Sequence, residues 1–202
     1  GDLTLHFFAG SGTTAHTVLK LNQEDSGNRR FILVSNTEAT ADAPDKNLCR
    51  DVCAERVRRV STGYRNKKGE WVEGLGGDLL KTRGASFAYL RAHRIPAELI
   101  LSRIEHEQVW TALQLIHTET LAPFDVAALV QRAETENGVM LYIPKVSEAV
   151  IEILEQAIHS AGTAVIYSWQ PGWLNQQIED ERASVQAIPQ FLINRFGLGT
   201  RA

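Results

Sequence analysis

The sequence predicts an α/β protein built from two portions, and this prediction depends on two observations. Short apolar, β-prone segments alternate with amphipathic helical segments near the start of the chain and again near its end. Strands that alternate with helices in this way form parallel sheets covered by helices. The composition changes near Pro96, where two helical patterns follow one another, so we divide the chain into residues 1–95 and 96–202.

The composition sets limits on the class of protein. Of the 202 residues, 44% are apolar and 22% are charged, which is typical of a globular chain that buries a core. The formal net charge of −3 means that contact with nucleic acid needs a local basic patch or a partner. Only two cysteines are present, Cys49 and Cys53, so no zinc or other metal site is expected. There is no long apolar run and no signal segment, so we expect no membrane contact and a cytoplasmic location.

Hydrophobic periodicity defines the elements of the first portion. We expect, in order, a buried strand over Leu3–Phe8, a helix capped by Thr13 or Thr14 that runs to about Leu21, a buried strand over Phe31–Val34, a helix over Leu48–Val60 capped by Asn47, an irregular segment over residues 63–77 and a third strand over Phe87–Leu90.

The second portion is expected to be helical at its start and α/β at its end. Helices are predicted over Ala97–Ile104, Glu107–Thr118, Asp125–Ala133, Ser147–Ser160 and Pro189–Phe196, and strands over Val139–Ile143, Ala164–Ser168 and Ser184–Ile188.

The segment Phe8–Thr14 is the candidate binding motif, because it places two glycines where an apolar strand turns into a helix. Glycines there let a ligand approach the backbone, and a helix N-terminus offers free N–H groups. Three ligand classes compete. A phosphate loop needs a lysine after the last glycine, where this chain has Thr13. A dinucleotide fingerprint needs glycine or alanine at the position of Ala15 and stays open. The third class is S-adenosylmethionine.

The run from His6 to His16 resembles the cofactor motif of amino-group DNA methyltransferases. It is similar to the β class, which methylates adenine N6 or cytosine N4 and includes the modification subunits of Type III restriction systems. The segments that extend this resemblance over roughly the first 95 residues are Asn28–Val34, Asn47–Val60, Gly74–Asp78 and Phe87–Leu90. The resemblance implies a C-terminal part of such an enzyme. Its fold would be a partial Rossmann-like S-adenosylmethionine methyltransferase sheet, followed by a smaller helical and α/β portion.

The resemblance also implies roles for individual residues. Phe8, Gly10 and Gly12 would line the methionine end of S-adenosylmethionine, and Thr13 and Thr14 would contact its carboxylate or cap the helix. Ala9 and Ser11 complete this cofactor-binding segment. Glu38, or alternatively Asn36, would bind the ribose hydroxyls. His6 departs from the family, which has aspartate there.

The catalytic motif of the family is absent from these residues. It is a short Asp/Asn-Pro-Pro-Tyr/Phe element that hydrogen-bonds the target amino group and stacks on the flipped base. The prolines of this chain are all isolated, at Pro44, Pro96, Pro123, Pro144, Pro171 and Pro189. We therefore name no catalytic residue and expect no methyl transfer by this chain alone. DNA would be bound together with a protein partner that supplies the catalytic and target-recognition half.

Two other functions stay open. The chain could be a non-catalytic interaction module of a restriction-modification system, docking through residues 96–202, or another nucleotide-binding α/β protein. A group of basic residues could face DNA phosphates or form a solvated surface. Its members are Arg50, Arg56, Arg58, Arg59, Arg65, Lys67 and Lys68.

Overall fold

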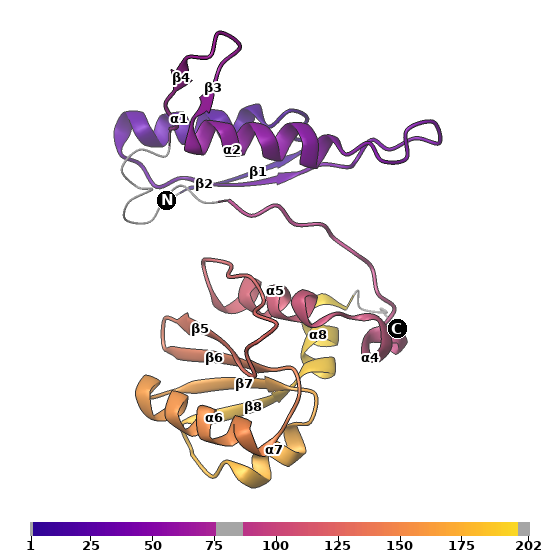
Figure 1. Ribbon diagram of the computed structural model, residues 1–202, viewed down its shortest axis with the longest axis vertical. Helices are drawn as coiled ribbons and strands as arrows, with labels where there is room; N and C mark the ends of the chain where they lie inside the picture. The colour runs from indigo at the N-terminus through magenta and orange to yellow at the C-terminus, as the bar shows by residue number, and fades with distance from the viewer. Residues whose placement is uncertain (1, 76–86, 198–202) are drawn as a thin grey trace. The chain divides into compact units, whose positions relative to one another are not determined.

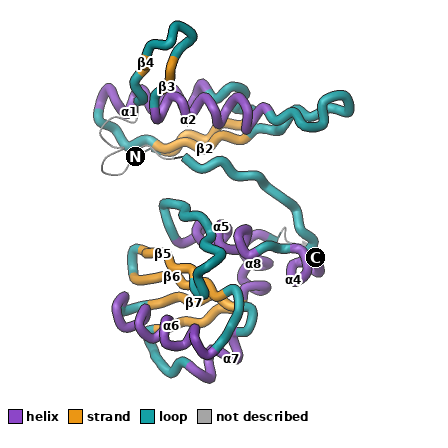
Figure 2. Tube along the Cα trace, viewed as in Figure 1, coloured by secondary structure: helices purple, strands orange, loops and turns teal. Residues whose placement is uncertain are grey.

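The computed structural model describes residues 2–75 and 87–197 (Figure 1). The chain divides into two compact units, Gly1–Arg91 and Ala92–Ala202. Both contain helices and strands (Figure 2), so the protein is mixed α/β. Within the described residues, no helix is both long and apolar enough to cross a membrane.

Unit 1 is built around a β–α–β segment. Its elements are β1 (Leu3–Phe7), α1 (Thr13–Asp25), β2 (Arg30–Val34), the π-helical segment η1 (Cys49–Ala54), α2 (Glu55–Thr62), β3 (Tyr64–Arg65) and β4 (Trp71–Val72). Strands β1 and β2 are parallel, and β3 and β4 form an antiparallel hairpin. The helix expected over Leu48–Val60 is present, with η1 running directly into α2. Its expected cap, Asn47, accepts a hydrogen bond from the Arg50 amide at 2.9 Å.

The two faces of the β1–β2 sheet differ sharply in burial. Phe31 and Leu33 pack with α1 and α2 around a small core of Ala15, Leu19 and Val57. The opposite face is apolar but exposed, and its exposed side chains are Leu3 (54%), Leu5 (52%), Phe7 (58%), Ile32 (48%) and Val34 (42%). The prediction that these strands are buried was therefore wrong for one face, since the described residues cover only the other.

Two further expectations for unit 1 need correction. Residues Phe87–Leu90 form no strand. Phe87 packs against the small core and the Tyr89 hydroxyl accepts a hydrogen bond from Asn47 at 3.2 Å, so side-chain contacts hold this segment in place of strand pairing. The segment expected to be irregular, residues 63–77, contains the β3–β4 hairpin. The part of Gly74–Asp78 beyond Leu75 lies outside the described residues.

Unit 2 contains a four-stranded sheet in the order β5-β6-β7-β8. Its elements are η2 (Ala97–Leu99), α4 (Ile100–Arg103), α5 (His106–His117), β5 (Gln131–Thr135), β6 (Gly138–Ile143), α6 (Glu148–Ala161), β7 (Ala164–Ser168), α7 (Pro171–Gln177), β8 (Ala183–Ala187) and α8 (Ile188–Phe196). Strands β6, β7 and β8 are parallel, and β5 is antiparallel to β6. Among the described residues, this sheet has more strands than either sheet of unit 1, so the second portion is not the smaller one that was expected.

Helices cover both faces of this sheet. One core joins β6 and β7 to α6 and α7 through residues such as Leu141, Ile166 and Leu154. The other joins them to α5 and α8 through Met140, Trp110 and related side chains. Strand β6 is consequently buried along almost its whole length, as parallel strands covered on both faces should be.

The helix predicted over Asp125–Ala133 is absent. The buried Gln131 side chain accepts a hydrogen bond from the Asp125 amide at 2.9 Å and donates one to the Asp125 carbonyl at 2.8 Å. These contacts hold residues 125–130 as turns, and Gln131 then begins β5, which pairs with β6. Pairing of the β6 edge thus overrides the local helical pattern of the apolar run after Asp125.

Candidate functional site

The glycine turn lies at the carboxyl edge of the β1–β2 sheet. Phe7 and Val34 are in register at the ends of the two parallel strands, so the turn and the loop after β2 begin side by side. The Ala9 amide donates a hydrogen bond to the Val34 carbonyl at 3.0 Å and ties the two together. Ala9 is itself buried, and its carbonyl accepts a hydrogen bond from the Gly12 amide at 2.9 Å, so Ala9 holds the turn and its neighbours are the residues open to a ligand. This edge is where open α/β sheets bind their ligands.

The backbone of the turn is unusual at three positions. Phe8, Gly10 and Gly12 have φ values of 61°, 52° and 77°. Of the three, Phe8 is the position where this conformation is costly, because a bulky residue in the left-handed region costs of order 1–2 kcal/mol. The Phe8 side chain is 89% exposed. The turn therefore keeps a strained backbone and presents an aromatic ring to its surroundings.

The two glycines differ in what surrounds them. A Cβ at Gly10 would lie no closer than 3.9 Å to any atom outside its immediate neighbours, so open space adjoins this backbone. A Cβ at Gly12 would lie 3.0 Å from Cys53 Sγ and 3.2 Å from the Cys53 carbonyl oxygen. Gly12 is thus required by close packing against η1, whereas Gly10 leaves room for a ligand.

The start of α1 has no side-chain cap. The helix begins at Thr13 with Gly12 as its N-cap residue, so the expectation that Thr13 or Thr14 caps it was wrong. The Thr14 hydroxyl instead pairs with His6 Nδ1 at 2.6 Å, and Thr13 is exposed. The first amide groups of α1 therefore have no side-chain acceptor, and the partly exposed Ser11 and the exposed Thr13 lie beside them.

The two candidates in the loop after β2 are placed differently. Asn36 is exposed two residues beyond the end of β2, at the same sheet edge as the turn. Glu38 has a φ of 53°, and its carboxylate pairs with Lys46 Nζ at 3.1 Å. A ligand that uses Glu38 must share that carboxylate with Lys46, whereas Asn36 has no such competitor among the contacts of the described residues.

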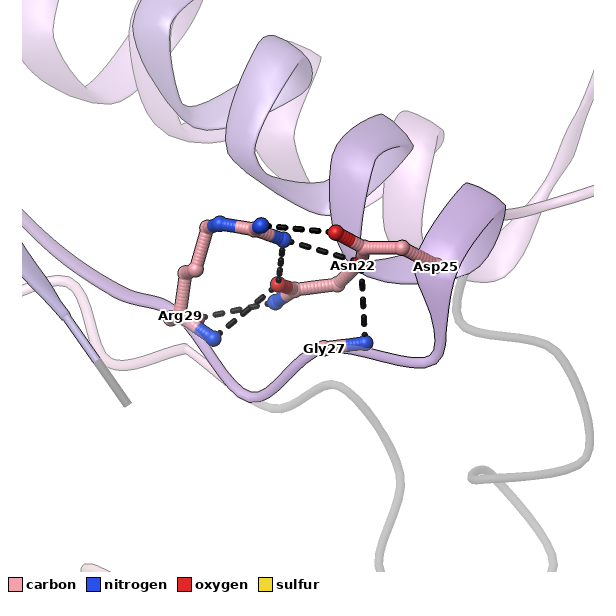
Figure 3. A network of polar contacts seen from close by, with 4 residues as sticks. All are labelled: Asn22, Asp25, Gly27 and Arg29. Atoms are coloured by element: carbon pink, nitrogen blue, oxygen red, sulfur yellow. Dashed lines mark hydrogen bonds and ion pairs between the residues drawn. The ribbon is translucent and has the colours of Figure 1, made fainter.

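A polar network fixes the position of β2 relative to α1 (Figure 3). The Asn22 side chain accepts a hydrogen bond from the Arg29 amide at 3.0 Å and donates one to the Arg29 carbonyl at 2.8 Å. Asp25 accepts two hydrogen bonds from the Arg29 guanidinium, at 2.9 and 2.6 Å, and this contact lowers the pKa of the Asp25 carboxyl. The network holds the return of the chain from α1 into β2.

Cys53 is a packing residue of the glycine turn. Burial raises the pKa of the Cys53 thiol, so it stays protonated and packs against Gly12. Among the residues that the structure describes, no cluster of three or more His, Cys, Asp or Glu side chains could hold a metal ion.

Apart from Arg56, the basic group singled out in the sequence separates into residues in ion pairs and residues on a hairpin. Arg58 and Arg59 share the Glu55 carboxylate at 2.7 and 2.6 Å, which lowers the pKa of Glu55 to about 2, and Arg50 pairs with Asp51. The remaining cations at the C-terminal end of the group, Arg65, Lys67 and Lys68, lie on the β3–β4 hairpin. Sequence reasoning missed this hairpin, although the Asn66–Gly69 spacing is a turn signal.

Comparison with known proteins finds relatives for only a part of the chain. No family model matches it. It is 43% identical to the Type III restriction-modification enzyme StyLTI Mod subunit of Salmonella typhimurium over 68 residues, 31% of this chain and 10% of that protein. It is 41% identical to the EcoP15I Mod subunit of Escherichia coli over 70 residues, 32% of this chain and 11% of that protein. The EcoPI Mod subunit of Escherichia phage P1 is 58% identical over 37 residues, 18% of this chain and 6% of that protein.

The relation is therefore to Mod subunits of Type III restriction-modification enzymes and is partial. The matches span about a tenth of the length of these relatives.

Proposed function

We propose that this chain is the S-adenosylmethionine-binding part of a β-class DNA adenine N6-methyltransferase. The observation that carries the proposal is the strained glycine turn between β1 and α1, which adjoins the loop after β2 at one sheet edge. The partial relation to Mod subunits supports the same function. In this proposal the chain takes part in modification of DNA in the cytoplasm.

The residues of the turn fit the cofactor. Its carboxylate needs N–H donors, which the uncapped start of α1 offers, and its methionine end needs close access to backbone, which the open space at Gly10 allows. No lysine follows Gly12, so the turn has no cation for a triphosphate. This combination favours the amino-acid end of S-adenosylmethionine over a phosphate group.

Each candidate residue has a part in holding the cofactor. Phe8 would contact it through its exposed ring, and the backbone of Gly10 and Ser11, held in place by the buried Ala9, would face its methionine end. Thr13 and the His6-bonded Thr14 lie at the helix start, near where the carboxylate would bind. Asn36 or Glu38 would bind the ribose hydroxyls. When bound, the cofactor supplies an electrophilic methyl group on its sulfonium.

We further propose that this chain does not transfer methyl groups by itself. The 202 residues contain no Pro-Pro pair, and we propose that a protein partner supplies the Asp/Asn-Pro-Pro-Tyr/Phe motif together with target recognition. The exposed apolar face of β1 and β2 supports this proposal, because parallel sheets are normally covered on both faces. Recognition of a specific DNA site would then need the two parts together.

Calorimetric titration of the chain with S-adenosylmethionine tests the cofactor proposal. Gly10→Leu places a side chain in the open space of the turn and should abolish saturable binding. Gly162→Leu is the matched control, since Gly162 also has a positive φ (78°) and open surroundings but lies at the end of α6. Binding that is equal in the two variants would contradict the assignment of the turn.

The outcome also separates the competing functions. A chain that binds nicotinamide dinucleotides in preference to S-adenosylmethionine would be another nucleotide-binding protein. A chain that binds neither, and that gains no cofactor affinity from a fragment carrying the catalytic motif, would be an interaction module.

A further inference from the structure

The β3–β4 hairpin is a tightly organised element that extends unit 1 beyond α2 (Figure 1). The Asn66 side chain accepts hydrogen bonds from the Lys68 and Glu70 amides at 2.9 and 3.1 Å and donates one to the Glu70 carboxylate at 2.8 Å. Gly69 has a φ of 81°, as this turn requires. The tip is therefore held in one conformation, and the side chains of Lys67 and Lys68 are exposed on it.

Charge is concentrated at this hairpin and the helix before it. Residues 55–72 carry six cationic and two acidic side chains, a net charge of +4 in a chain whose formal net charge is −3. Arg58 and Arg59 are paired with Glu55, which partly neutralises the helix. Within the described residues, the hairpin cations Arg65, Lys67 and Lys68 form no ion pair, and neither does Arg56 on α2. The net positive charge is therefore shared between the helix and the hairpin, and on the hairpin all three cations are free of acidic partners.

An exposed aromatic ring lies beside these cations. Trp71 is 57% exposed and stands opposite Arg65 in the strand register. Its ring packs against Gly63, where an added Cβ would lie 2.7 Å from Trp71 Cζ2. The hairpin thus presents a supported aromatic surface next to three cations, and the Arg65 guanidinium is steadied by a hydrogen bond to the Gly69 carbonyl at 3.0 Å.

We propose that the β3–β4 hairpin binds the DNA backbone, with Lys67, Lys68 and Arg65 on phosphates and Trp71 against a sugar or an unstacked base. Lysine and arginine on phosphates supply sequence-independent affinity, and an aromatic ring adds contact with a base. One isolated tryptophan on a rigid turn offers little apolar area for insertion into a lipid surface, so the hairpin fits a polyanion better. The choice of DNA over other polyanions rests on the proposed function.

The salt dependence of DNA binding tests this proposal on the full chain. Binding to a labelled 20-base-pair duplex is followed by fluorescence anisotropy from low to moderate salt. The logarithm of the association constant falls linearly with the logarithm of the salt concentration. Removal of two phosphate contacts in Lys67→Ala/Lys68→Ala should make this negative slope shallower by about 2. Lys20→Ala/Lys145→Ala removes the same charge from exposed sites outside the hairpin and should leave the slope unchanged.

A second readout reports on Trp71. Of the four tryptophans, Trp110 is buried at 2% exposure and Trp71 is the strongly exposed one, so DNA should quench a fluorescence component that Trp71→Phe removes. The proposal is overturned if the chain binds no duplex, if both lysine pairs have the same slope, or if the hairpin variant loses only binding to anionic lipid vesicles. The two tests are independent. If the chain fails to bind S-adenosylmethionine, the proposed function is refuted, but a salt dependence of DNA binding that requires the hairpin would still support this inference.

Discussion

At the scale of single residues, Gly12 and Gly162 form a natural pair for separating backbone strain from packing. Their φ values are nearly equal, 77° and 78°, but a Cβ at Gly12 meets Cys53 while one at Gly162 meets no atom within 4 Å. Gly162→Ala should cost only the strain of a left-handed residue, about 1 kcal/mol. Gly12→Ala should cost about 2–3 kcal/mol, because the contact with Cys53 is added to that strain. Urea unfolding of the two variants measures the difference. Equal losses in the free energy of unfolding would show that η1 moves to accommodate the added Cβ and that the contact with Cys53 is not destabilising.

His117 gives a pH dependence to unit 2. Its Nε2 atom pairs with the buried Tyr167 hydroxyl at 2.6 Å, burial lowers the pKa of His117, and burial raises the pKa of Tyr167 to about 12. The hydroxyl thus stays protonated and donates to a neutral imidazole. Because the folded-state pKa of His117 is lowered, its stabilising contribution is complete above the ordinary value of about 6.5 and is lost as the pH falls through the folded-state pKa.

His117→Gln should therefore lower the free energy of unfolding by about 1–2 kcal/mol at pH 7.5, where it removes the partner of a buried hydroxyl. The variant should also lose less stability than the parent between pH 7 and pH 5. Denaturant unfolding at several pH values measures both effects. The exposed His159→Gln serves as control, and a parallel pH profile for His117→Gln and the parent would refute the role of His117.

At the scale of elements, two hydrogen bonds between the Asn22 side chain and the Arg29 backbone link the end of α1 to the segment that enters β2 (Figure 3). Asn22→Ala leaves the amide and the carbonyl of Arg29 without their partner and should cost about 1–2 kcal/mol. Asn175→Ala, in the exposed part of α7, should change stability by less than about 0.5 kcal/mol. Thermal unfolding of the two variants checks this prediction. Equal small shifts would mean that water replaces the Asn22 contacts.

Local sequence predicted most elements but failed where pairing partners decide. The apolar run after Asp125 has a helical pattern, but Gln131–Thr135 is a strand because it pairs with β6. Phe87–Leu90 looks like a strand but finds no strand to pair with among the described residues. Both errors have one cause, because periodicity describes a segment by itself and a strand exists only through its neighbours.

At the scale of the whole molecule, the two units differ in how well their sheets are protected. Strands β6 and β7 are covered on both faces, whereas β1 and β2 are covered on one. Amide hydrogen exchange on the full chain should therefore be slower in β6 and β7 than in β1 and β2. S-adenosylmethionine should slow exchange in β1 and at the start of α1 and leave β6 and β7 unchanged, because a ligand stabilises the state that binds it. Similar protection in both sheets would contradict this account.

The sequence by itself determined most of the strands and helices and the position of the glycine turn, because each depends on neighbouring residues. Only the tertiary structure decided that Gly12 is required by Cys53, that Thr14 pairs with His6 and that Arg58 and Arg59 share Glu55 while other basic residues lie on a hairpin. These features join residues distant in the chain or depend on how side chains pair in space. Burial and pairing energies arise from such contacts, which no local pattern records.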